Sequence, residues 1–321
     1  MNEKLIAILR EEKNYISGEE LSRRLGISRT AVWKSINVLR EYGYHITSST
    51  NKGYRLEEDN DLLDSTAIRN NLNAKIIGSK IMVLKTVDST NEEVKRQAAK
   101  GAENGLVVAA ECQTQGKGRL GRNWSSGTGG LFFSVLLRPD IPPTDVASVT
   151  LAAGLGVCLA VREYTGLDAR IKWPNDVIVG RKKLCGILTE MAAQTDRIDY
   201  VDIGIGINVN IEEFPEEITE KATSLLLETG KKIDRSDFLR CVLQKLDKVI
   251  NSFLVSLSVE DMQMFSELCA TLGRQVAFTR NGIVTEGTAV SVTAAGELVI
   301  RCPDGRECMV NSGEVTVQGI Y

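Results

Sequence analysis

The chain has 321 residues, of which 43% are hydrophobic and 25% charged, and its formal net charge is −3. This length leaves room for two or three domains, and the apolar content is ample for packed cores. No segment reaches the roughly 18 uninterrupted apolar residues of a membrane helix, and the N-terminus lacks the apolar core of a signal peptide. We therefore expect a soluble, cytoplasmic protein without a membrane partner.

Two helices are predicted at the start of the chain. The core face of the first is formed by Leu5, Ile6, Ile8 and Leu9. A capping box of Ser17 and Glu20 begins the second helix, which continues to Leu25. Gly26 then makes a tight turn.

A third, cationic helix is predicted at residues 28–42, with Ser28 as its cap. Its inward side carries Val32, Ile36 and Leu39, at spacings of four and three. The side that we expect to face outward carries Arg29, Thr30, Trp33, Lys34, Asn37 and Arg40. Two helices joined by a tight glycine turn are typical of a helix-turn-helix motif, in which residues 28–42 form the recognition helix.

A hairpin follows the third helix. Residues 45–49 and 53–56 alternate like two short strands, and the turn between them can place Lys52 and Arg55 against phosphates. Residues 1–56 carry 10 Lys and Arg against 6 Asp and Glu, a net charge of +4, whereas the rest carries 29 against 36, a net charge of −7. This asymmetry favours a DNA-binding winged helix, although a small helical protein-interaction domain remains the alternative. The predicted DNA contacts are Ser28, Arg29, Thr30, Trp33, Lys34, Asn37, Lys52 and Arg55.

The acidic stretch 57–61 lacks core residues, and we interpret it as a linker to a mixed α+β body. Strands are predicted at residues 81–87, 106–111, 131–137, 169–172, 176–179, 184–191 and 200–208, and helices at 91–100 and 146–164. In residues 273–321, short strands are separated by Asn281-Gly282, Ala295-Gly296, Asp304-Gly305 and Ser312-Gly313. This spacing predicts a small β-barrel.

Cysteine and histidine usage excludes several kinds of site. The seven cysteines include no CxxC pair, which favours reduced, mostly buried thiols over a zinc site. The single histidine, His45, lies far from the glycine-rich run described next, so a Ser-His-Asp triad is not expected. We interpret His45 as a structural or surface residue.

The run QTQGKGRLGRNW, residues 113–124, combines three glycines with three cations. Glycine allows close approach of the backbone to a ligand, and Lys117, Arg119 and Arg122 suit carboxylate and phosphate oxygens. Together with KWPND at residues 172–176, the run indicates adenylation chemistry. The spacing also fits GxGxxG, but a dinucleotide-binding turn needs a helix directly after the glycines, and a polar segment and a strand are predicted here. A plain flexible loop remains open as an alternative.

Several further motifs occur in an order that resembles one family closely. DSTN at residues 88–91, KLCGIL at 183–188 and GIGINVN at 204–210 accompany the two motifs above and the winged helix. This combination resembles the bifunctional biotin–protein ligases that also repress the biotin operon, the BirA family. The resemblance implies three domains: a winged helix-turn-helix at 1–61, a mixed α/β ligase domain at 62–271, and an SH3-like β-barrel at 272–321. The ligase domain would be similar to those of lipoate ligases and class II aminoacyl-tRNA synthetases.

The resemblance also implies roles for individual residues. Biotin is expected to contact Ser89, Thr90, Asn91, Gln113, Gly116, Lys117, Gly118, Arg119 and Lys183. ATP and the adenylate are expected to contact Arg119, Arg122, Trp124, Lys172, Asn175, Asp176, Lys183 and Asn208. The catalytic cations would be Lys183 and Arg119, acting with Mg²⁺ on the charge of the α-phosphate, and Asp176 would assist attack by the acceptor lysine. No metal ligand from the protein is predicted.

Local sequence leaves other interpretations open for some of these residues. Ser89 and Thr90 could cap the following helix, Trp124 could belong to the core, and Lys183 could be a solvated lysine beside two other cations. The chain also departs from the family pattern at Lys117, where arginine is common, and at Leu120, where another cation can stand. Lysine lacks the planar fork of arginine, so retention of the adenylate could differ in strength.

The implied reaction has two steps. The carboxylate of biotin attacks the α-phosphate of ATP, giving biotinyl-5′-adenylate and pyrophosphate, and a lysine of a biotin carboxyl-carrier domain then attacks the activated carbonyl. An ionised carboxylate needs no general base, which agrees with a single histidine. With the adenylate bound, such a protein represses transcription as a homodimer on operator DNA. A lipoate ligase, a ligand-sensing transcription factor without catalysis and an NAD-binding regulator are the alternatives.

Overall fold

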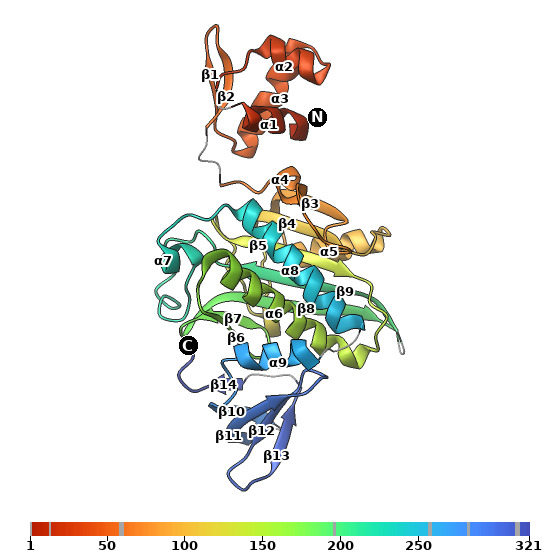
Figure 1. Ribbon diagram of the computed structural model, residues 1–321, viewed down its shortest axis with the longest axis vertical. Helices are drawn as coiled ribbons and strands as arrows, with labels where there is room; N and C mark the ends of the chain where they lie inside the picture. The colour runs from red at the N-terminus through yellow and green to blue at the C-terminus, as the bar shows by residue number, and fades with distance from the viewer. Residues whose placement is uncertain are drawn as a thin grey trace. The chain divides into compact units, whose positions relative to one another are not determined.

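The computed structural model describes residues 2–12, 14–57, 61–194, 197–255, 259–280, 283–311 and 315–321. The chain divides into two compact units, Met1–Asn70 and Asn71–Tyr321, which we treat separately (Figure 1). Most of the predicted linker at 57–61 lies outside the described residues, as do the predicted turns Asn281-Gly282 and Ser312-Gly313.

The first unit is a winged helix-turn-helix, as predicted. Its elements are α1 (Asn2–Glu11), α2 (Gly18–Leu25), α3 (Arg29–Tyr42), β1 (Ile46–Ser49) and β2 (Gly53–Leu56). The side chain of Ser17 accepts a hydrogen bond from the Glu20 amide (3.1 Å), and Ser28 accepts one from Ala31 (3.2 Å), so both predicted caps form. Gly26 makes the turn at a φ of 66°, a conformation that side chains disfavour. The three helices and the wing enclose one apolar core.

A short helix that was not predicted, α4 (Ser65–Arg69), closes the first unit. Asp64 caps it by accepting hydrogen bonds from the amides of Thr66 (2.7 Å) and Ala67 (2.9 Å). The same buried carboxylate forms an ion pair with Arg10 of α1 (2.8 Å). Asp64 therefore ties the segment after the wing back to the first helix.

The second unit is built on a mixed seven-stranded sheet in the order β3-β4-β5-β9-β8-β7-β6. Its strands are β3 (Lys80–Val87), β4 (Leu106–Gln113), β5 (Leu131–Leu137), β6 (Ala169–Lys172), β7 (Asp176–Val179), β8 (Lys182–Ala193) and β9 (Ile198–Ile207). Strands β3 and β4 pair in parallel, and the other neighbours pair antiparallel. Every residue of β5 is buried, so the sheet is covered on both faces at its centre.

Five helices of the described residues accompany the sheet: α5 (Thr90–Ala99), α6 (Val146–Thr165), α7 (Leu225–Thr229), α8 (Arg235–Val255) and α9 (Val259–Leu268). Helix α8 was not predicted, and it lies beside α6 (Figure 1). The segment Pro143–Thr165 is long and apolar enough to cross a membrane, but 67% of its most apolar 18-residue stretch is buried inside the protein. Gly156 of α6 packs against the backbone of Leu246 in α8. Helix α6 is therefore a core helix.

The C-terminal strands form an antiparallel β domain, as predicted. They are β10 (Gln275–Arg280), β11 (Ile283–Val292), β12 (Leu298–Arg301), β13 (Glu307–Val310) and β14 (Val315–Val317), in the order β13-β12-β11-β10-β14. The predicted turn at Gly296 forms, with a φ of 89°. Its carbonyl accepts a hydrogen bond from the indole of buried Trp173 (3.0 Å), which anchors this domain to the strand connection between β6 and β7.

Candidate active site

A cavity of about 710 Å³ in the second unit gathers the predicted ligand-binding residues. The start of α5, the glycine-rich loop, the ends of β6 to β9 and the C-terminal strand β14 all contribute to its lining. The predicted residues that line it are Ser89, Thr90, Asn91, Gln113, Lys117, Gly118, Arg119, Arg122, Trp124, Lys172, Asn175, Asp176, Lys183 and Asn208. Gly116 lines a neighbouring depression instead. Residues from five separate motifs therefore meet at one site.

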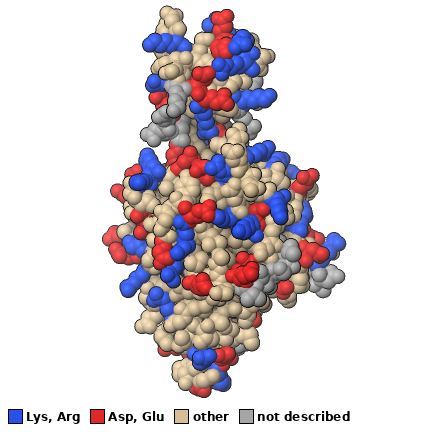
Figure 2. Space-filling model, viewed as in Figure 1, with Lys and Arg blue, Asp and Glu red and all other residues tan. Residues whose placement is uncertain are grey.

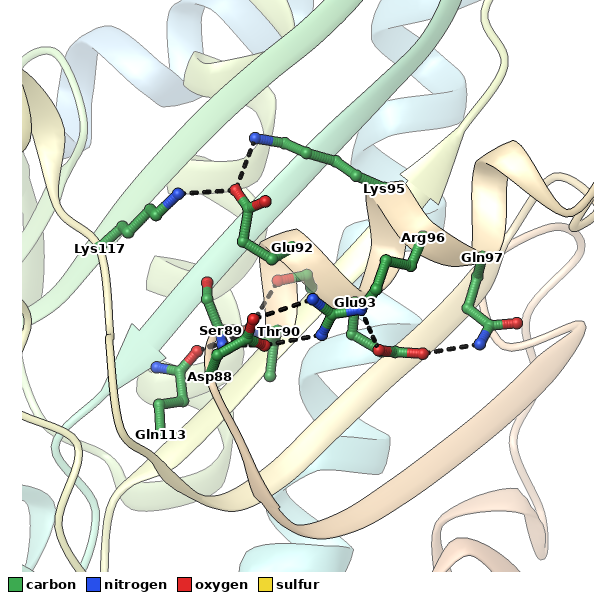
Figure 3. Close-up of polar contacts among 11 residues, drawn as sticks. Asp88, Ser89, Thr90, Glu92, Glu93, Lys95, Arg96, Gln97, Gln113 and Lys117 are labelled. Atoms are coloured by element: carbon green, nitrogen blue, oxygen red, sulfur yellow. Dashed lines mark hydrogen bonds and ion pairs between the residues drawn. The ribbon is translucent and has the colours of Figure 1, made fainter.

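One end of the cavity is a cluster of neutral polar side chains at the start of α5. Thr90 donates from its amide to the Gln113 side-chain oxygen (2.8 Å), and the Gln113 amide donates to the hydroxyl of Ser126 (2.8 Å). The hydroxyl of Ser134, on β5, lies 2.8 Å from that of Thr90 (Figure 3 shows Thr90 and Gln113). Within the described segment 61–194, the side chain of Ser89 makes no capping hydrogen bond. Ser126 and Ser134 were not singled out in the sequence.

An acidic pair lies beneath this cluster. The side-chain amide of Asn91 donates to Asp202 (2.9 Å) and to Glu190 (3.1 Å), and its oxygen accepts from Ser134 (2.7 Å). Burial, followed by the neighbouring Glu190, raises the pKa of Asp202 to about 8. A side chain at Gly204 would collide with the Asn91 oxygen, 1.9 Å from a Cβ. The carboxyls therefore fix which way the Asn91 amide points.

The glycine-rich loop folds back on itself. The amide of Gly118 donates to the Arg122 carbonyl (2.7 Å), and that of Trp124 donates to the Gly116 carbonyl (2.9 Å). The helical turn within it, Arg119–Gly121, has only three residues, and the next element is the strand β5. This order contradicts a dinucleotide-binding turn, as the sequence predicted. At its tip Leu120 is 70% exposed with a φ of 56°.

Ion pairs connect the loop to α5. Lys117 contacts Glu92 (2.7 Å), which also contacts Lys95 (3.1 Å), as Figure 3 shows. The Lys117 contact, followed by that with Lys95, lowers the pKa of Glu92. Lys95 in turn reaches Glu190 (3.1 Å), so the chain of charges continues to the acidic pair. These contacts hold the loop over the polar cluster.

Trp124 lies against the sheet rather than in the central core. A Cβ at Gly186 or at Gly206 would come within 2.6 Å of its ring, so both glycines are required for its position. The ammonium of Lys183 is 5.3 Å from the ring centroid. Among the described residues, the buried indole nitrogen has no hydrogen-bond partner. The ring therefore packs on strands β8 and β9 beside Lys183, inside the cavity.

Cations gather at the other end of the cavity. The Lys183 ammonium lies 2.7 Å from a carboxylate oxygen of Asp176, and with a side chain 28% exposed it is not a solvated surface lysine. Arg119 donates to the Asn175 side chain (2.9 Å), and burial lowers the pKa of Arg119. Burial also lowers the pKa of Lys172, to about 8. Such desolvated cations favour a bound anion.

Three further contacts define this charged end. The side-chain amide of Asn208 donates to the Thr223 carbonyl (3.0 Å), so this predicted ligand residue also supports the loop after β9. The hydroxyl of Tyr321 donates to Asp176, and the Lys172 ammonium lies 3.4 Å from the centre of the Tyr321 ring. Tyr321 was missed in the sequence because nothing local connects it with residues 145 positions away.

In the first unit, most predicted DNA-contact residues are exposed, and Figure 2 shows Lys and Arg side chains on its surface. The exposed ones are Ser28, Arg29, Thr30, Trp33, Lys34 and Lys52, and Asn37 is half-buried. The prediction that Arg40 faces outward is wrong, because this half-buried side chain donates to the Ile46 carbonyl of the wing (2.9 Å). Arg55 pairs with Glu57 (2.8 Å) and lies over the ring of Tyr15, so it braces the wing. His45 is exposed.

Family models match all three parts of the chain. Residues 83–208 match the biotin/lipoate A/B protein ligase family, residues 2–55 match a helix-turn-helix domain, and residues 271–317 match the biotin protein ligase C-terminal domain. Residues 83–208 include the start of α5, the glycine-rich loop and the charged end of the cavity. The helix-turn-helix match lies within the first unit, and the two ligase matches lie within the second unit, which holds the site.

Individual relatives are similar over most of their length. The bifunctional ligase/repressor BirA of Bacillus subtilis is 37% identical over 91% of this chain and 90% of its own, and that of Escherichia coli is 32% identical over 78% and 76%. The biotin protein ligase of Aquifex aeolicus, solved with biotin and ATP, is 34% identical, with a TM-score of 0.66 over 75% of this chain and 99% of its own. A ligase from Leishmania major, solved with biotinyl-5-AMP, is 25% identical, with a TM-score of 0.50 over 73% and 99%. The chain therefore belongs to the family of biotin protein ligases that carry a DNA-binding helix-turn-helix domain, the bifunctional ligase/repressors.

Proposed function

We propose that this chain joins biotin to ATP and transfers the biotinyl group to a lysine of a biotin carboxyl-carrier domain. The observation that carries the proposal is the polarity of the cavity, which has a neutral hydrogen-bonding cluster at one end and desolvated cations at the other. Biotin and ATP occupy the Aquifex relative, and biotinyl-5-AMP occupies the Leishmania relative. A molecule with a polar ring and a carboxylate tail fits this gradient.

The neutral end suits the ureido ring of biotin. A urea offers two N–H donors and one carbonyl acceptor, which hydroxyls and amides satisfy without a buried charge. Ser89, Thr90 and Gln113 supply such groups, and Asn91 shapes the cluster through Ser134. Gly116, Lys117 and Gly118 then close the loop over the tail of the ligand.

The charged end suits adenylation. The biotin carboxylate attacks the α-phosphorus of ATP, an acyl-phosphate bond forms, and the bond to the bridging oxygen breaks to release pyrophosphate. Negative charge collects on the α-phosphate and the leaving group, and Lys183 and Arg119 are the cations placed to stabilise it. Arg122, Trp124, Lys172, Asn175 and Asn208 are assigned to the nucleotide. Each of these residues lines the cavity.

Transfer completes the cycle. The neutral amine of the carrier lysine attacks the activated carbonyl, and AMP leaves with the electrons of the acyl-phosphate bond. Asp176, with Lys183 on one oxygen and Tyr321 on the other, is assigned to orient or deprotonate that amine. Among the described residues, no three His, Cys, Asp or Glu side chains could hold a metal ion together. We assign Mg²⁺ to the phosphates of ATP, as part of the substrate complex.

We also propose that the chain is a cytoplasmic repressor, with domains at 1–61, 62–271 and 272–321. One intermediate can serve both roles if the adenylate favours a dimer, because a ligand biases such an equilibrium only through differential affinity. The support is the loop itself, which covers the cavity and carries the exposed Leu120 at its tip. The predicted DNA contacts then belong to two copies on paired half-sites.

One experiment tests both activities in sequence. The full chain is incubated with ATP and labelled biotin. Its sedimentation and its affinity for DNA fragments selected in vitro are recorded before and after an unbiotinylated carrier domain is added. We expect the adenylate to promote self-association and tighter DNA binding, and the carrier to reverse both while becoming labelled with biotin. An oligomeric state and DNA affinity indifferent to the adenylate would remove the switch and leave the ligase; an unlabelled carrier would remove the ligase.

A further inference from the structure

Tyr321 reaches the charged end of the cavity from the C-terminal β domain. Its backbone amide donates to the Arg181 carbonyl in the turn between β7 and β8 (3.2 Å), and the neighbouring Ile320 is buried. Strand β14 lines the same cavity through Val315 and Val317. The backbone at Tyr321 is therefore held in place, and the residue, which is 36% exposed, lies at the edge of the cavity.

This side chain contacts two oppositely charged groups at once. Its hydroxyl donates to Asp176, and its ring lies under the Lys172 ammonium at 3.4 Å. Lys172 and Asp176 face each other across the β6–β7 pair. An aromatic face attracts a cation most strongly when the cation has lost its water. Tyr321 therefore compensates the lysine for part of the hydration that burial removes.

The protonation state of Lys172 depends on the groups that surround it. Burial lowers its pKa to about 8, Asp176 acts in the opposite direction, and Lys183 acts in the same direction as burial. Arg122 is the other charged group near the tyrosine. Replacing the ring by a smaller side chain would remove the cation–π contact, which favours the ammonium, but would also admit water, which favours it more. The pKa of Lys172 should therefore move towards its ordinary value of 10.5.

We propose that Tyr321 is a positioning residue for the use of ATP, holding the Lys172 ammonium and the Asp176 carboxylate in place at the nucleotide end of the cavity. The proposal rests on the proposed function, in which both residues serve the nucleotide. Among the described residues, none of the hydrogen bonds of the neutral cluster that we assign to biotin involves Tyr321.

Two substitutions in the full chain separate the contacts of Tyr321. Tyr321→Phe keeps the ring under Lys172 and removes the hydroxyl, whereas Tyr321→Leu removes both. Tyr164→Phe is the matched control, because its hydroxyl also donates to an aspartate, Asp237 (3.0 Å), on helices away from the cavity. Steady-state adenylation is measured between pH 6.5 and 9.5.

We expect Tyr321→Leu to raise KM for ATP about threefold to tenfold, in the range of one cation–π contact, and to leave KM for biotin within about twofold. In Tyr321→Leu the alkaline limb of the pH–rate profile should move to higher pH. Tyr321→Phe should keep the alkaline limb of the wild-type chain and show only a lower adenylation rate. Tyr164→Phe should change none of these. Equal rises of KM for both substrates in Tyr321→Leu, or an unmoved alkaline limb, would overturn the proposal.

A second readout does not depend on ligase activity. Trace acetylation of the lysines across the pH range, quantified by mass spectrometry, reports the titration of Lys172 in each variant. We expect its midpoint near 8 in the wild-type chain and in Tyr321→Phe, and a higher midpoint in Tyr321→Leu. A chain without biotin-dependent activity but with this shift would refute the proposed function alone. Identical titration of Lys172 in all variants would refute the role of Tyr321.

Discussion

Replacing the buried carboxyl Asp202 by asparagine should stabilise the protein at neutral pH. Asp202 is fully buried beneath the polar cluster, and its pKa is raised to about 8 by burial and by Glu190. An asparagine has the same shape, and its side-chain oxygen can accept the hydrogen bond that Asn91 now donates at 2.9 Å. The substitution therefore removes the titration and preserves the contact.

The sign and size of the stability change in Asp202→Asn follow from proton linkage. The unfolded carboxyl has a pKa near 3.8 and the folded one a pKa of about 8, so folding at pH 7 requires uptake of a proton. Between these two values the contribution of Asp202 to stability falls by about 1.4 kcal/mol per pH unit, because the unfolded state binds fewer protons. By pH 7 the loss amounts to about 4 kcal/mol. Asp202→Asn should recover about 2–4 kcal/mol of it at pH 7 and almost none at pH 4.

Urea unfolding at pH 4 to 8, followed by tryptophan fluorescence, measures this difference. The matched control is Asp247→Asn, another buried aspartate, whose two oxygens accept hydrogen bonds from the amides of Lys75, Ile76 and Ile77 at 2.7, 2.8 and 2.9 Å. An asparagine at position 247 would have to point its side-chain NH₂ group at a backbone N–H group, so the free energy of unfolding should fall. A gain in Asp202→Asn that does not vary with pH, or no gain at all, would refute the linkage argument.

Three further predictions concern the two activities. Lys183→Gln should slow adenylate formation roughly a hundredfold, because one preorganised charge donor contributes about 3 kcal/mol. The control is Lys182→Gln, because the Lys182 side chain donates to the Thr219 carbonyl, and this variant should keep the wild-type rate. Quench-flow assays of biotinyl-AMP formation would measure both rates. Arg119→Gly should form the adenylate but release it, because the bond to Asn175 and the phosphate contact are lost, and bystander proteins should become biotinylated; wild-type levels of released adenylate would refute the gate. Removing residues 1–61 should abolish DNA binding and spare biotin transfer, and Arg29→Ala or Lys34→Ala should flatten the salt dependence of DNA binding. Unchanged DNA affinity in both point variants would remove the recognition-helix assignment.

Local patterns were sufficient for most of the fold. Strands β5, β6 and β7 begin and end at the predicted residues, because short apolar runs between turn residues identify buried strands. The caps Ser17 and Ser28 were also predicted correctly, since a hydroxyl side chain just before a helical pattern usually accepts a hydrogen bond from an amide of the first turn. Glu20, however, pairs with Arg23 and Arg24, so the returning half of its capping box is replaced by ion pairs.

Site residues that belong to sequence motifs were predicted. Site residues that only tertiary packing brings into the cavity were missed. Asn91 and Asp202 are 111 positions apart, and Tyr321 and Asp176 are 145 positions apart, so no spacing rule connects them. One signal was present for Asp202, which is the one charged residue in the otherwise apolar part of strand β9, residues 201–207. Such a residue is unexpected in a buried strand and indicates a specific partner. The prediction that Arg40 faces outward was wrong for a related reason: helical periodicity does not show that the wing folds over the outer face of the helix.

Biotin-dependent exchange of labelled pyrophosphate into ATP tests the central claim most directly, because it requires only binding of the two substrates and reversible adenylation. The full chain should catalyse exchange with biotin and not with lipoate, since the neutral cluster of Ser89, Thr90 and Gln113 suits a ureido ring and a dithiolane has no N–H group to offer. Exchange that depends on lipoate, or its absence with biotin and MgATP at saturation, would contradict the account.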